Sequence, residues 1–472
     1  MTHDVPAAPD RPAGPTLDRR YATRAQARAI GRARRKAVPR AALAERVASE
    51  RDPLAHLAEQ NAERAADLVP LRMARMLANP FSFFRGTAGL MALDLAADPH
   101  SEILVAACGD AHLSNFGFYA SPERQLVFDL NDFDEAAVAP WEWDVKRLVT
   151  SVVVGGAHAG YDERDVRRAA DRAFAGYADS LRALVELSPA DRYFIHAGAD
   201  AARRRIDRQS RQVLRRATAA AERRTAERVL RRTTERDAEG RLRFVEQPPT
   251  MTHTGFDDGR SGTEMYADYL GSVGLDLALV LRQYAPADVV RRVVGVGSVG
   301  TRCLLVLLTG ADDDALVLQV KEANESVLSR YGGVAQPQTL QAPLGRSGNG
   351  ARVVGFQRVL QAFSDPFLGH LRAGDRDFYV RQFHDMKGSI ELHGLEPAPF
   401  AEYGQACATM LARAHAQSPT AAEVVGYIGS SPAAGRAIVD WSFAYAQQSL
   451  ADFEALRAAA AAGRVELATD AG

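Results

Sequence analysis

The spacing of apolar residues along the chain predicts both helices and strands. Helical stretches show apolar residues at intervals of three and four, or long runs rich in alanine and arginine with few helix breakers. Two short apolar runs bounded by polar residues, at 103–108 and 125–130, instead have the length of buried strands. The pattern predicts helices at 54–76, 88–97, 143–235, 400–417 and 434–461.

The stretch from residue 288 to residue 390 has a different character, because strand-like apolar runs dominate it. The polar segment 309–314 separates two of these runs, which predicts a hairpin. Residues 332–350 are rich in glycine, proline and glutamine and indicate a loop. Helices and strands that occupy separate parts of the chain predict an α+β fold. Strands in this stretch are expected at 303–308, 315–320, 353–360 and 378–383.

Composition narrows the class of protein. The chain has 472 residues, of which 47% are hydrophobic and 25% charged, so it is expected to be globular and to form two or three domains. No apolar run approaches the length of a membrane span, and the N-terminus lacks the pattern of a secretory signal. The three cysteines, Cys108, Cys303 and Cys407, fit neither a disulfide framework nor a zinc site. We therefore expect a cytoplasmic protein with no membrane partner.

The net charge of −1 gives no general reason to expect binding to nucleic acid. Residues 1–46 are rich in proline, alanine and arginine, and they predict a mobile basic arm with some helix. Such an arm could contact nucleic acid or another acidic partner, but a solvated tail is the favoured interpretation. The oligomeric state is not predicted.

A short polar motif follows the first predicted strand. Gly109 and Asp110 come directly after the apolar run, and Asn115 lies five residues beyond Asp110. Kinases use an aspartate to orient or deprotonate the accepting hydroxyl, and an asparagine five residues later to bind Mg²⁺. Asp110 and His112 are therefore candidate catalytic residues, and Asn115 is a candidate metal ligand. The alternative is a polar loop in which Asp110 and Asn115 only form turns.

An acidic run follows the second predicted strand. Asp129, Asp132 and Asp134 lie close together, with Phe133 among them. Neighbouring carboxylates repel one another unless cations neutralise them, and Mg²⁺ prefers hard oxygen ligands. An exposed acidic turn is the alternative, but Phe133 argues against full exposure. We expect these three aspartates to supply metal ligands.

A glycine-rich segment opens the strand-rich stretch. Gly295, Gly297, Ser298 and Gly300 lie at the start of the predicted hairpin. Glycines in such a turn let backbone N–H groups approach phosphate groups. The segment lacks the Gly-Lys-Ser/Thr ending of a P-loop, so it is not one. An ordinary hairpin with glycines is the alternative.

Lysine is rare in this chain, since only four of the 58 basic residues are lysines. Lys321 ends the second hairpin strand, about 20 residues after the glycine-rich segment, which is a spacing typical of the ATP-binding lysine of kinases. Glu325 or Glu322 could pair with Lys321. Together the glycines and Lys321 indicate an ATP-binding half of a site.

Several motifs resemble DUF2252, a bacterial family without a settled activity, over roughly residues 50–455. This family is in turn similar to the kinase-like superfamily of aminoglycoside and choline kinases. The resemblance implies that Asp132, rather than Asp129, is the principal metal ligand, and that Asp144 supports the backbone of the Asp110 loop. The motifs that carry it lie at Arg75–Gly86, Gly109–Gly117, Asn131–Glu135, Trp143–Leu148, Val294–Arg302 and Gln319–Ala323.

The order of these parts differs from that of kinases, in which the glycine loop and lysine precede the catalytic loop. Here they follow it by about 180 residues, and a helix similar to the one that normally precedes the catalytic loop lies at 403–417. A circularly permuted, two-lobed kinase-like fold would explain this order. It predicts a mobile arm at 1–46, a mainly helical catalytic lobe at 47–287, a β-rich nucleotide lobe at 288–390, and helices at 391–472 that complete the catalytic lobe.

The leading hypothesis is an ATP- and Mg²⁺-dependent phosphotransferase that acts on an unknown, small hydroxylated acceptor. A second hypothesis is a nucleotide-binding pseudokinase or regulatory module. A third is a metal-dependent hydrolase that uses Asp110, His112, Asp132 and Asp134. Nucleotide binding separates the first two hypotheses from the third, and turnover separates the first from the second.

Overall fold

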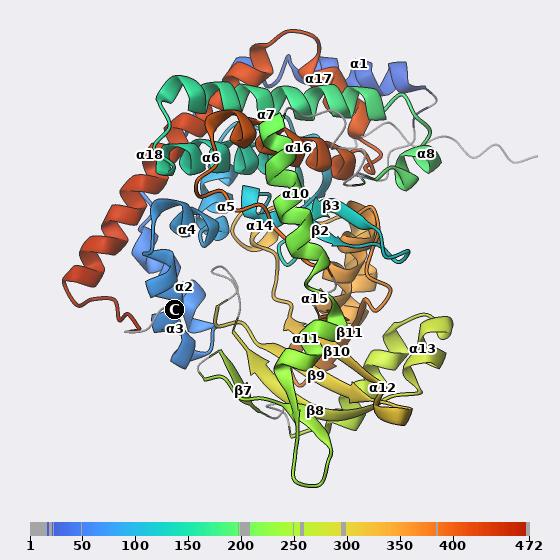
Figure 1. Cartoon of the computed structure of the whole chain (residues 1–472). Coiled ribbons are helices and arrows are strands. Elements are labelled where there is room, and N and C mark those ends of the chain that lie inside the picture. Colours follow the sequence, from blue (N-terminus) through green and yellow to red (C-terminus); the bar gives the residue numbers. More distant parts are fainter. Residues whose placement is uncertain are drawn as a thin grey trace, which may run out of the picture.

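The computed structural model describes residues 17, 21, 23–48, 50–196, 198, 208–248, 250–254, 259–293, 299–383 and 386–468, with the backbone alone at 313, 339–344 and 346. The fold is α+β, as expected. A bundle of helices occupies one side of the molecule and an antiparallel sheet the other (Figure 1). We call these parts the helical region and the sheet region.

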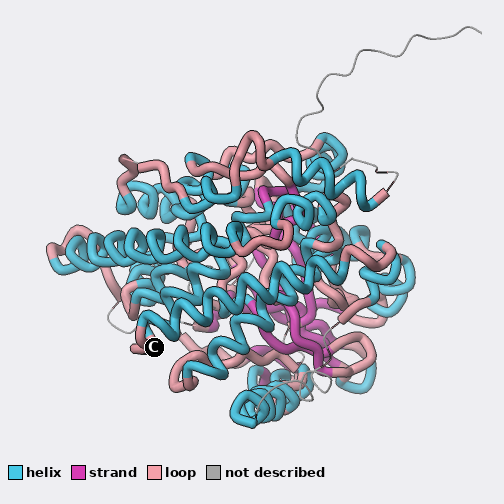
Figure 2. The backbone as a smooth tube through the Cα atoms, turned by 90° about the horizontal axis from the view of Figure 1, so that it is seen from above, coloured by secondary structure: helices cyan, strands magenta, loops and turns pink. Residues whose placement is uncertain are grey.

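The helical region is built around α6, α7, α16 and α18, and α6 packs on each of the other three. Seen from above, the long helices of the molecule lie side by side (Figure 2). Their facing residues form the largest apolar core of the described chain. Segments that are far apart in the sequence form this bundle together, as α6 and α16 do. The helices run over α1 (Arg24–Arg34), α2 (Pro53–Ala62), α3 (Val69–Met76), α4 (Pro80–Arg85), α5 (Ala88–Ala97), α6 (Trp141–His158), α7 (Glu163–Leu184), α8 (Pro189–Phe194), α16 (Pro397–His415), α17 (Ala421–Ile428) and α18 (Ala433–Ala461).

Two short antiparallel sheets lie against these helices. β1 (Leu104–Ala107) pairs with β4 (Ala137–Pro140), and β2 (Phe116–Ala120) pairs with β3 (Leu126–Leu130). The loops that join these strands carry the motif at Asp110 and the acidic run, so both motifs lie at the edge of the helical region.

The sheet region contains a six-stranded antiparallel sheet in the order β11-β12-β10-β9-β8-β7. Helices α12 and α13 accompany this sheet, and apolar side chains of α12 join the apolar core on one of its faces. The other face carries Lys321 on β10, which is in register with Tyr379 on β12. The elements are β7 (Met251–His253), α12 (Gly262–Ser272), α13 (Leu275–Leu281), β8 (Ala285–Arg292), β9 (Cys303–Thr309), β10 (Ala315–Glu322), β11 (Gly369–Ala373) and β12 (Arg376–Gln382).

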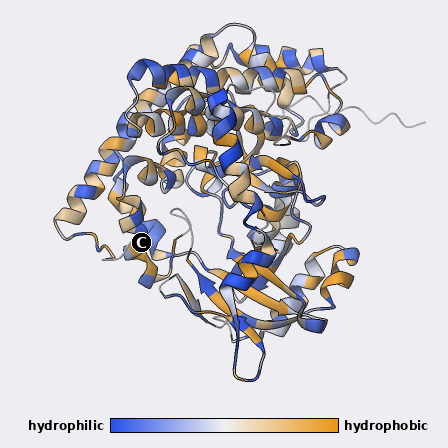
Figure 3. Ribbon diagram, in the orientation of Figure 1, coloured by the Kyte–Doolittle hydropathy of each residue, from blue (hydrophilic) through white to orange (hydrophobic). Residues whose placement is uncertain are grey.

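Four further helices connect the two regions. The largely hydrophilic α10 (Arg208–Glu222) packs on α16 and β2 and leads to α11 (Ala226–Thr233), which contacts β10 (Figure 3). The small hairpin β5 (Thr234–Arg236) and β6 (Leu242–Phe244) follows. α14 (Val327–Arg330) and α15 (Gln338–Leu360) run from β10 back toward the helical region, where they contact α5 and α16.

Several expectations about the fold are wrong in the described residues, and the helices expected at 54–76 and 143–235 are each divided into shorter elements. The segment 353–360, expected to be a strand, is the second half of helix α15, and part of the expected loop at 332–350 forms its first half. The arm is not mobile from residue 23 to residue 46, because α1 packs on α17 and buries Ala27 and Gly31. The sheet region begins before residue 288, since β7 pairs with β8.

None of the described helices is both long and apolar enough to cross a lipid bilayer.

Candidate functional site

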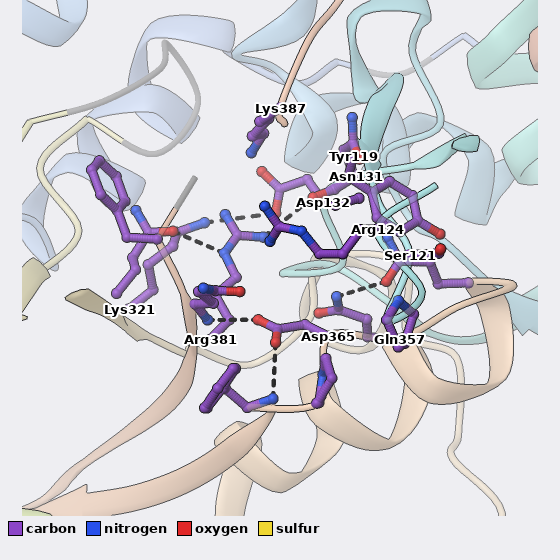
Figure 4. A pocket seen from close by; sticks show the side chains of 18 residues that line it. Tyr119, Ser121, Arg124, Asn131, Asp132, Lys321, Gln357, Asp365, Arg381 and Lys387 are labelled. Carbon is purple, nitrogen blue, oxygen red and sulfur yellow. Dashed lines mark hydrogen bonds and ion pairs between the residues drawn. The ribbon is translucent and has the colours of Figure 1, made fainter. Parts of the chain in front are cut away.

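Two adjoining cavities separate the helical region from the sheet region. The larger, of about 460 Å³, is lined by Lys321 and Arg381 from the sheet. The smaller, of about 350 Å³, is lined by Asp110 and by other residues of the helical region. Asn131, Asp132 and Lys387 line both cavities. Asp132 therefore lies where the two cavities meet, with Lys321, Arg381 and Lys387 around it (Figure 4).

Asp144 holds the loop that carries Asp110. Its two carboxylate oxygens accept hydrogen bonds from the backbone N–H groups of Cys108, at 2.6 Å, and Gly109, at 2.9 Å. The imidazole Nε2 of His415, on α16, lies 3.1 Å from the same carboxylate. The support that the resemblance implied for Asp144 is thus present, and it joins α6 and α16 to the loop.

Gly109 is required by both conformation and space. Its φ is +81°, and an added Cβ would lie 2.1 Å from the carbonyl oxygen of Glu135. Gly160 has nearly the same φ, +80°, but an added Cβ there would meet no atom within 4 Å. A comparison of substitutions at the two glycines can therefore distinguish the cost of backbone strain from the cost of a steric clash.

We expect Gly109→Ala to lower the free energy of unfolding by more than about 3 kcal/mol, against about 1 kcal/mol for Gly160→Ala. Only the first substitution must displace the acidic run. Urea denaturation of both variants measures the difference. Equal losses would show that the contact between Gly109 and Glu135 is unimportant.

Asp110, which lines the smaller cavity, has one carboxylate oxygen in an ion pair and the other close to His112. The guanidinium of Arg147, on α6, donates to Oδ1 at 2.8 Å. Oδ2 lies 3.6 Å from Nε2 of His112. Burial raises the pKa of Asp110, although Arg147 opposes the rise, and burial and nearby arginines lower the pKa of His112 well below its usual value. His112 is therefore neutral, and Oδ2 of Asp110 can accept a proton or a hydrogen bond.

Asn115 ties the Asp110 loop to the acidic run. Its side-chain amide donates to the backbone oxygens of Asp110, at 3.0 Å, and Asp132, at 3.1 Å. Its Oδ1 atom is buried and has no hydrogen-bond partner among the described residues, and the same holds for Oδ1 of Asp132. Unpartnered buried oxygen atoms are costly, so two of them in one site indicate that a ligand satisfies them.

Lys321 reaches the acidic run from the sheet. Its Nζ lies 2.6 Å from Oδ2 of Asp134 and 3.6 Å from Oδ1 of Asp132. The Tyr379 hydroxyl donates to Oδ1 of Asp134 at 2.7 Å. Burial opposes ionisation of Asp132, but Lys321, Arg381 and Lys387 outweigh it and lower the pKa of that carboxyl. Burial and the charge of Asp132 raise the pKa of Asp134.

The expected pairing of Lys321 with Glu322 or Glu325 is wrong. Among the described residues its ion-pair partners are Asp132 and Asp134. Glu322, which is adjacent on the strand, pairs instead with Arg376 at 2.6 Å. Glu325 is exposed.

Asp129 lies apart from this cluster. Its carboxylate accepts from the backbone N–H groups of Ala362, at 2.8 Å, and of its own neighbour Leu130. It lines neither cavity, whereas Asp132 lines both. The geometry therefore favours Asp132 over Asp129 as a ligand, as the resemblance implied.

Gly295, Gly297 and Ser298 lie outside the described residues, so their expected contacts with nucleotide phosphates stay a prediction. Gly300 is described and has a φ of +89°. Its carbonyl oxygen accepts from the N–H of Ala65, and Arg64 donates to the carbonyl oxygen of Val299 at 2.6 Å. The end of the glycine-rich segment is thus held against the helical region.

The sequence assigns no role to several residues of the site, although it shows dense charges at 379–388 that could face the cleft. Arg147 follows Asp144 by three positions on α6, a spacing that places both on one helical face. Tyr379 and Arg381 lie two residues apart on β12 and therefore share one face of the sheet. The pairing of β12 with β10 places them on the face that carries Lys321. Lys387 reaches the cavities because Gly388 and Phe118 form an antiparallel bridge, which no local pattern reveals.

The site offers a metal ion only a few ligand atoms of its own. In the described ranges, no group of three or more His, Cys, Asp and Glu side chains could hold a metal by itself. Magnesium in phosphate-binding sites is usually held by one or two carboxylates together with substrate phosphates. The free oxygens of Asn115 and Asp132 suit that mode. The site therefore fits Mg²⁺ in company with a bound phosphate group.

The fold and the site define an α+β protein in which a buried lysine pairs with two partly exposed aspartates between the helical and sheet regions. Residues 64–459 match the family described as "Uncharacterized protein conserved in bacteria (DUF2252)". The match covers more than half of the chain, so the protein belongs to this family, and that resemblance is confirmed. No curated protein and no solved structure matches the chain.

Proposed function

We propose that this protein is an ATP- and Mg²⁺-dependent phosphotransferase with a circularly permuted, two-lobed kinase-like fold. The observation that carries the proposal is the meeting of Lys321 with Asp132 and Asp134. The 2.6 Å contact joins residues 187 positions apart, and Asp134 lines the same cavity as Asp110 and Asn115. Phosphoryl transfer in kinases uses this set of groups: a strand lysine, a metal-binding aspartate, a metal-binding asparagine and a base.

The order of elements supports the permutation. Strands β8 and β9 flank the glycine-rich segment, and Lys321 lies on the next strand, β10, as the kinase lysine lies on the third strand of its lobe. Helix α15 then follows β10, and β11, β12 and α16 come after it. Helix α16 meets Asp144 through His415, so the last part of the chain completes the site that the first part begins.

Each residue has a role in this proposal. Lys321 and the glycine-rich segment bind the nucleotide phosphates, and Asn115 and Asp132 hold Mg²⁺, which neutralises charge on the transferred group when bound. Oδ2 of Asp110 accepts the hydrogen bond of the acceptor hydroxyl. Arg147 fixes the Asp110 carboxylate by its bond to Oδ1.

The test measures Mg-ATP binding and phosphate release by the wild type and by Asp132→Asn and Asp110→Asn. We expect Asp132→Asn to weaken Mg-ATP binding at least about tenfold, because one metal ligand loses its charge. Asp110→Asn should retain binding and lower turnover about 100-fold or more. Asp165→Asn, on the surface helix α7, is the control. A wild type that does not bind Mg-ATP would refute the proposal.

A second candidate is a nucleotide-binding module without transfer. One observation favours it: residues 338–360, which form α15, contain no carboxylate. Active protein kinases require an ion pair between the strand lysine and a glutamate on the helix that follows. Here Lys321 pairs with Asp134 instead. Mg-ATP binding with no turnover on any acceptor would support this candidate.

A further inference from the structure

We propose that the acceptor carries an oxyanion group, a phosphate or a carboxylate, which Arg85 binds beside Asp110 in the smaller cavity. The inference rests on the proposed phosphotransferase function and names the class of its acceptor. Three observations carry it: the pairing of carboxylates in this cavity, the unpartnered cations, and the position of Arg85.

Most carboxylates that line the smaller cavity already have a cationic partner. Asp110 pairs with Arg147 at 2.8 Å, Asp134 with Lys321 at 2.6 Å, and Glu322 with Arg376 at 2.6 Å. Asp132 shares Lys321 at 3.6 Å. Arg147 and Arg376 line neither cavity, and Lys321 lines only the larger one. The carboxylates of the smaller cavity are therefore neutralised by cations that do not line it.

The cationic side chains that line the smaller cavity, in contrast, are not paired with carboxylates in the described part of the chain. Arg85, Arg224 and Lys387 line the smaller cavity, and none of them forms an ion pair with a carboxylate in the described part of the chain. Nε of Arg85 is also buried without a hydrogen-bond partner there. A partly buried guanidinium that lacks partners is unfavourable until an oxyanion satisfies it, and guanidinium binds carboxylate and phosphate well.

The local fold places Arg85 at the acceptor side. It is the last residue of α4, which Asn79 caps at its start by accepting from Ser82 N–H, and Gly86 ends the helix. Arg147 bonds Asp110 and also donates to the carbonyl oxygen of Phe84, so one side chain links Asp110 to α4. Arg85, Asp110 and His112 all line the smaller cavity.

Nucleotide phosphates are the other possible source of an oxyanion. Lys321, however, lines the larger cavity, and Arg85 lines the smaller one, with Asp132 between the two cavities. Arg85 is therefore on the side of Asp110, where an acceptor hydroxyl must lie. The same cations repel a positively charged acceptor, so an aminoglycoside or choline is a poor fit to this cavity.

The test uses inorganic phosphate as the probe and the full chain with its nucleotide site filled by a non-hydrolysable ATP analogue and Mg²⁺. Calorimetry compares the wild type with Arg85→Ala, Arg85→Gln and the surface control Arg164→Ala. We expect both Arg85 variants to weaken phosphate binding at least about tenfold, with Kd for Mg-ATP changed less than about threefold. Arg164→Ala should leave phosphate binding unchanged. The glutamine variant, with its longer side chain, guards against loss of folding, which thermal unfolding checks.

Equal weakening of phosphate and Mg-ATP binding would place Arg85 in the nucleotide site and overturn the inference. Phosphate binding that is absent, or independent of Arg85, would overturn it too. If the wild type binds phosphate through Arg85 without nucleotide but does not bind Mg-ATP, the anion site stands and the phosphotransferase proposal fails. The two failures are therefore distinguishable.

Discussion

Replacing Asp144 with alanine is expected to lower the free energy of unfolding by about 3 to 5 kcal/mol. The substitution removes the acceptor for two buried backbone N–H groups, those of Cys108 and Gly109, and the partner of His415. Unsatisfied buried donors keep their full desolvation cost. Urea denaturation, followed by circular dichroism, measures the loss.

Asp165 provides a matched control, since it occupies the first turn of α7 as Asp144 occupies the first turn of α6. Asp165→Ala loses the helix-dipole contribution and a surface pair with Arg168, and should lower the free energy of unfolding by less than about 1 kcal/mol. A double-mutant cycle with His415→Ala should give a coupling energy of about 1 kcal/mol or more. Equal losses in Asp144→Ala and Asp165→Ala would mean that the loop contacts contribute nothing.

Local patterns predict most of the regular elements, and the failure at α15 has a physical cause. The helices at 88–97 and 434–461 and the short strands before Asp110 and Asp132 agree with the structure to within a few residues. The sequence of α15 indicates a loop and a strand because its first half is rich in glycine, proline and glutamine and its second half holds a short apolar run. Gln357, near the end of α15, and Gln361, which follows it, are buried but polar. The side-chain amide of Gln357 donates to Gln361, and that of Gln361 donates to the carbonyl oxygen of Leu130. A helical period is hard to recognise when buried positions are polar.

The residues of the site likewise fall into those that the sequence identifies and those that it does not. Asp110, Asn115 and Asp132 could be identified because their spacing within one short stretch reflects a chemical requirement. The partners of Lys321 could not be found by local reasoning, which offered the glutamates that follow it on the chain. The true partners depend on how the sheet packs against the helical region, and a strand's neighbours in sequence point to alternate faces. Arg85 belongs to the motif Arg75–Gly86, but the sequence assigns it no role.

Lys321→Ala is expected to reduce kcat/KM for Mg-ATP about 1,000-fold or more, because it removes the charge that meets the phosphates and leaves the charges of Asp132 and Asp134 unneutralised. The side chain of Lys321 is only 3% exposed, so solvent cannot replace its ammonium group. A coupled assay of ADP formation measures the change. Lys36→Ala, at an exposed position of the basic N-terminal segment, is the control and should have no effect.

The pH dependence gives an independent test of the same contact. Lys321 lowers the pKa of Asp132 and opposes the rise in the pKa of Asp134. Without Lys321 both pKa values should rise, so residual activity that needs these carboxylates ionised should fall at a higher pH on the acid side than in the wild type. Lys321→Arg restores the charge without the compact ammonium, and should recover the acid limb more than the rate. If Lys321→Ala keeps activity within about tenfold and leaves the acid limb unmoved, Lys321 is not the nucleotide lysine and the permuted arrangement loses its main support.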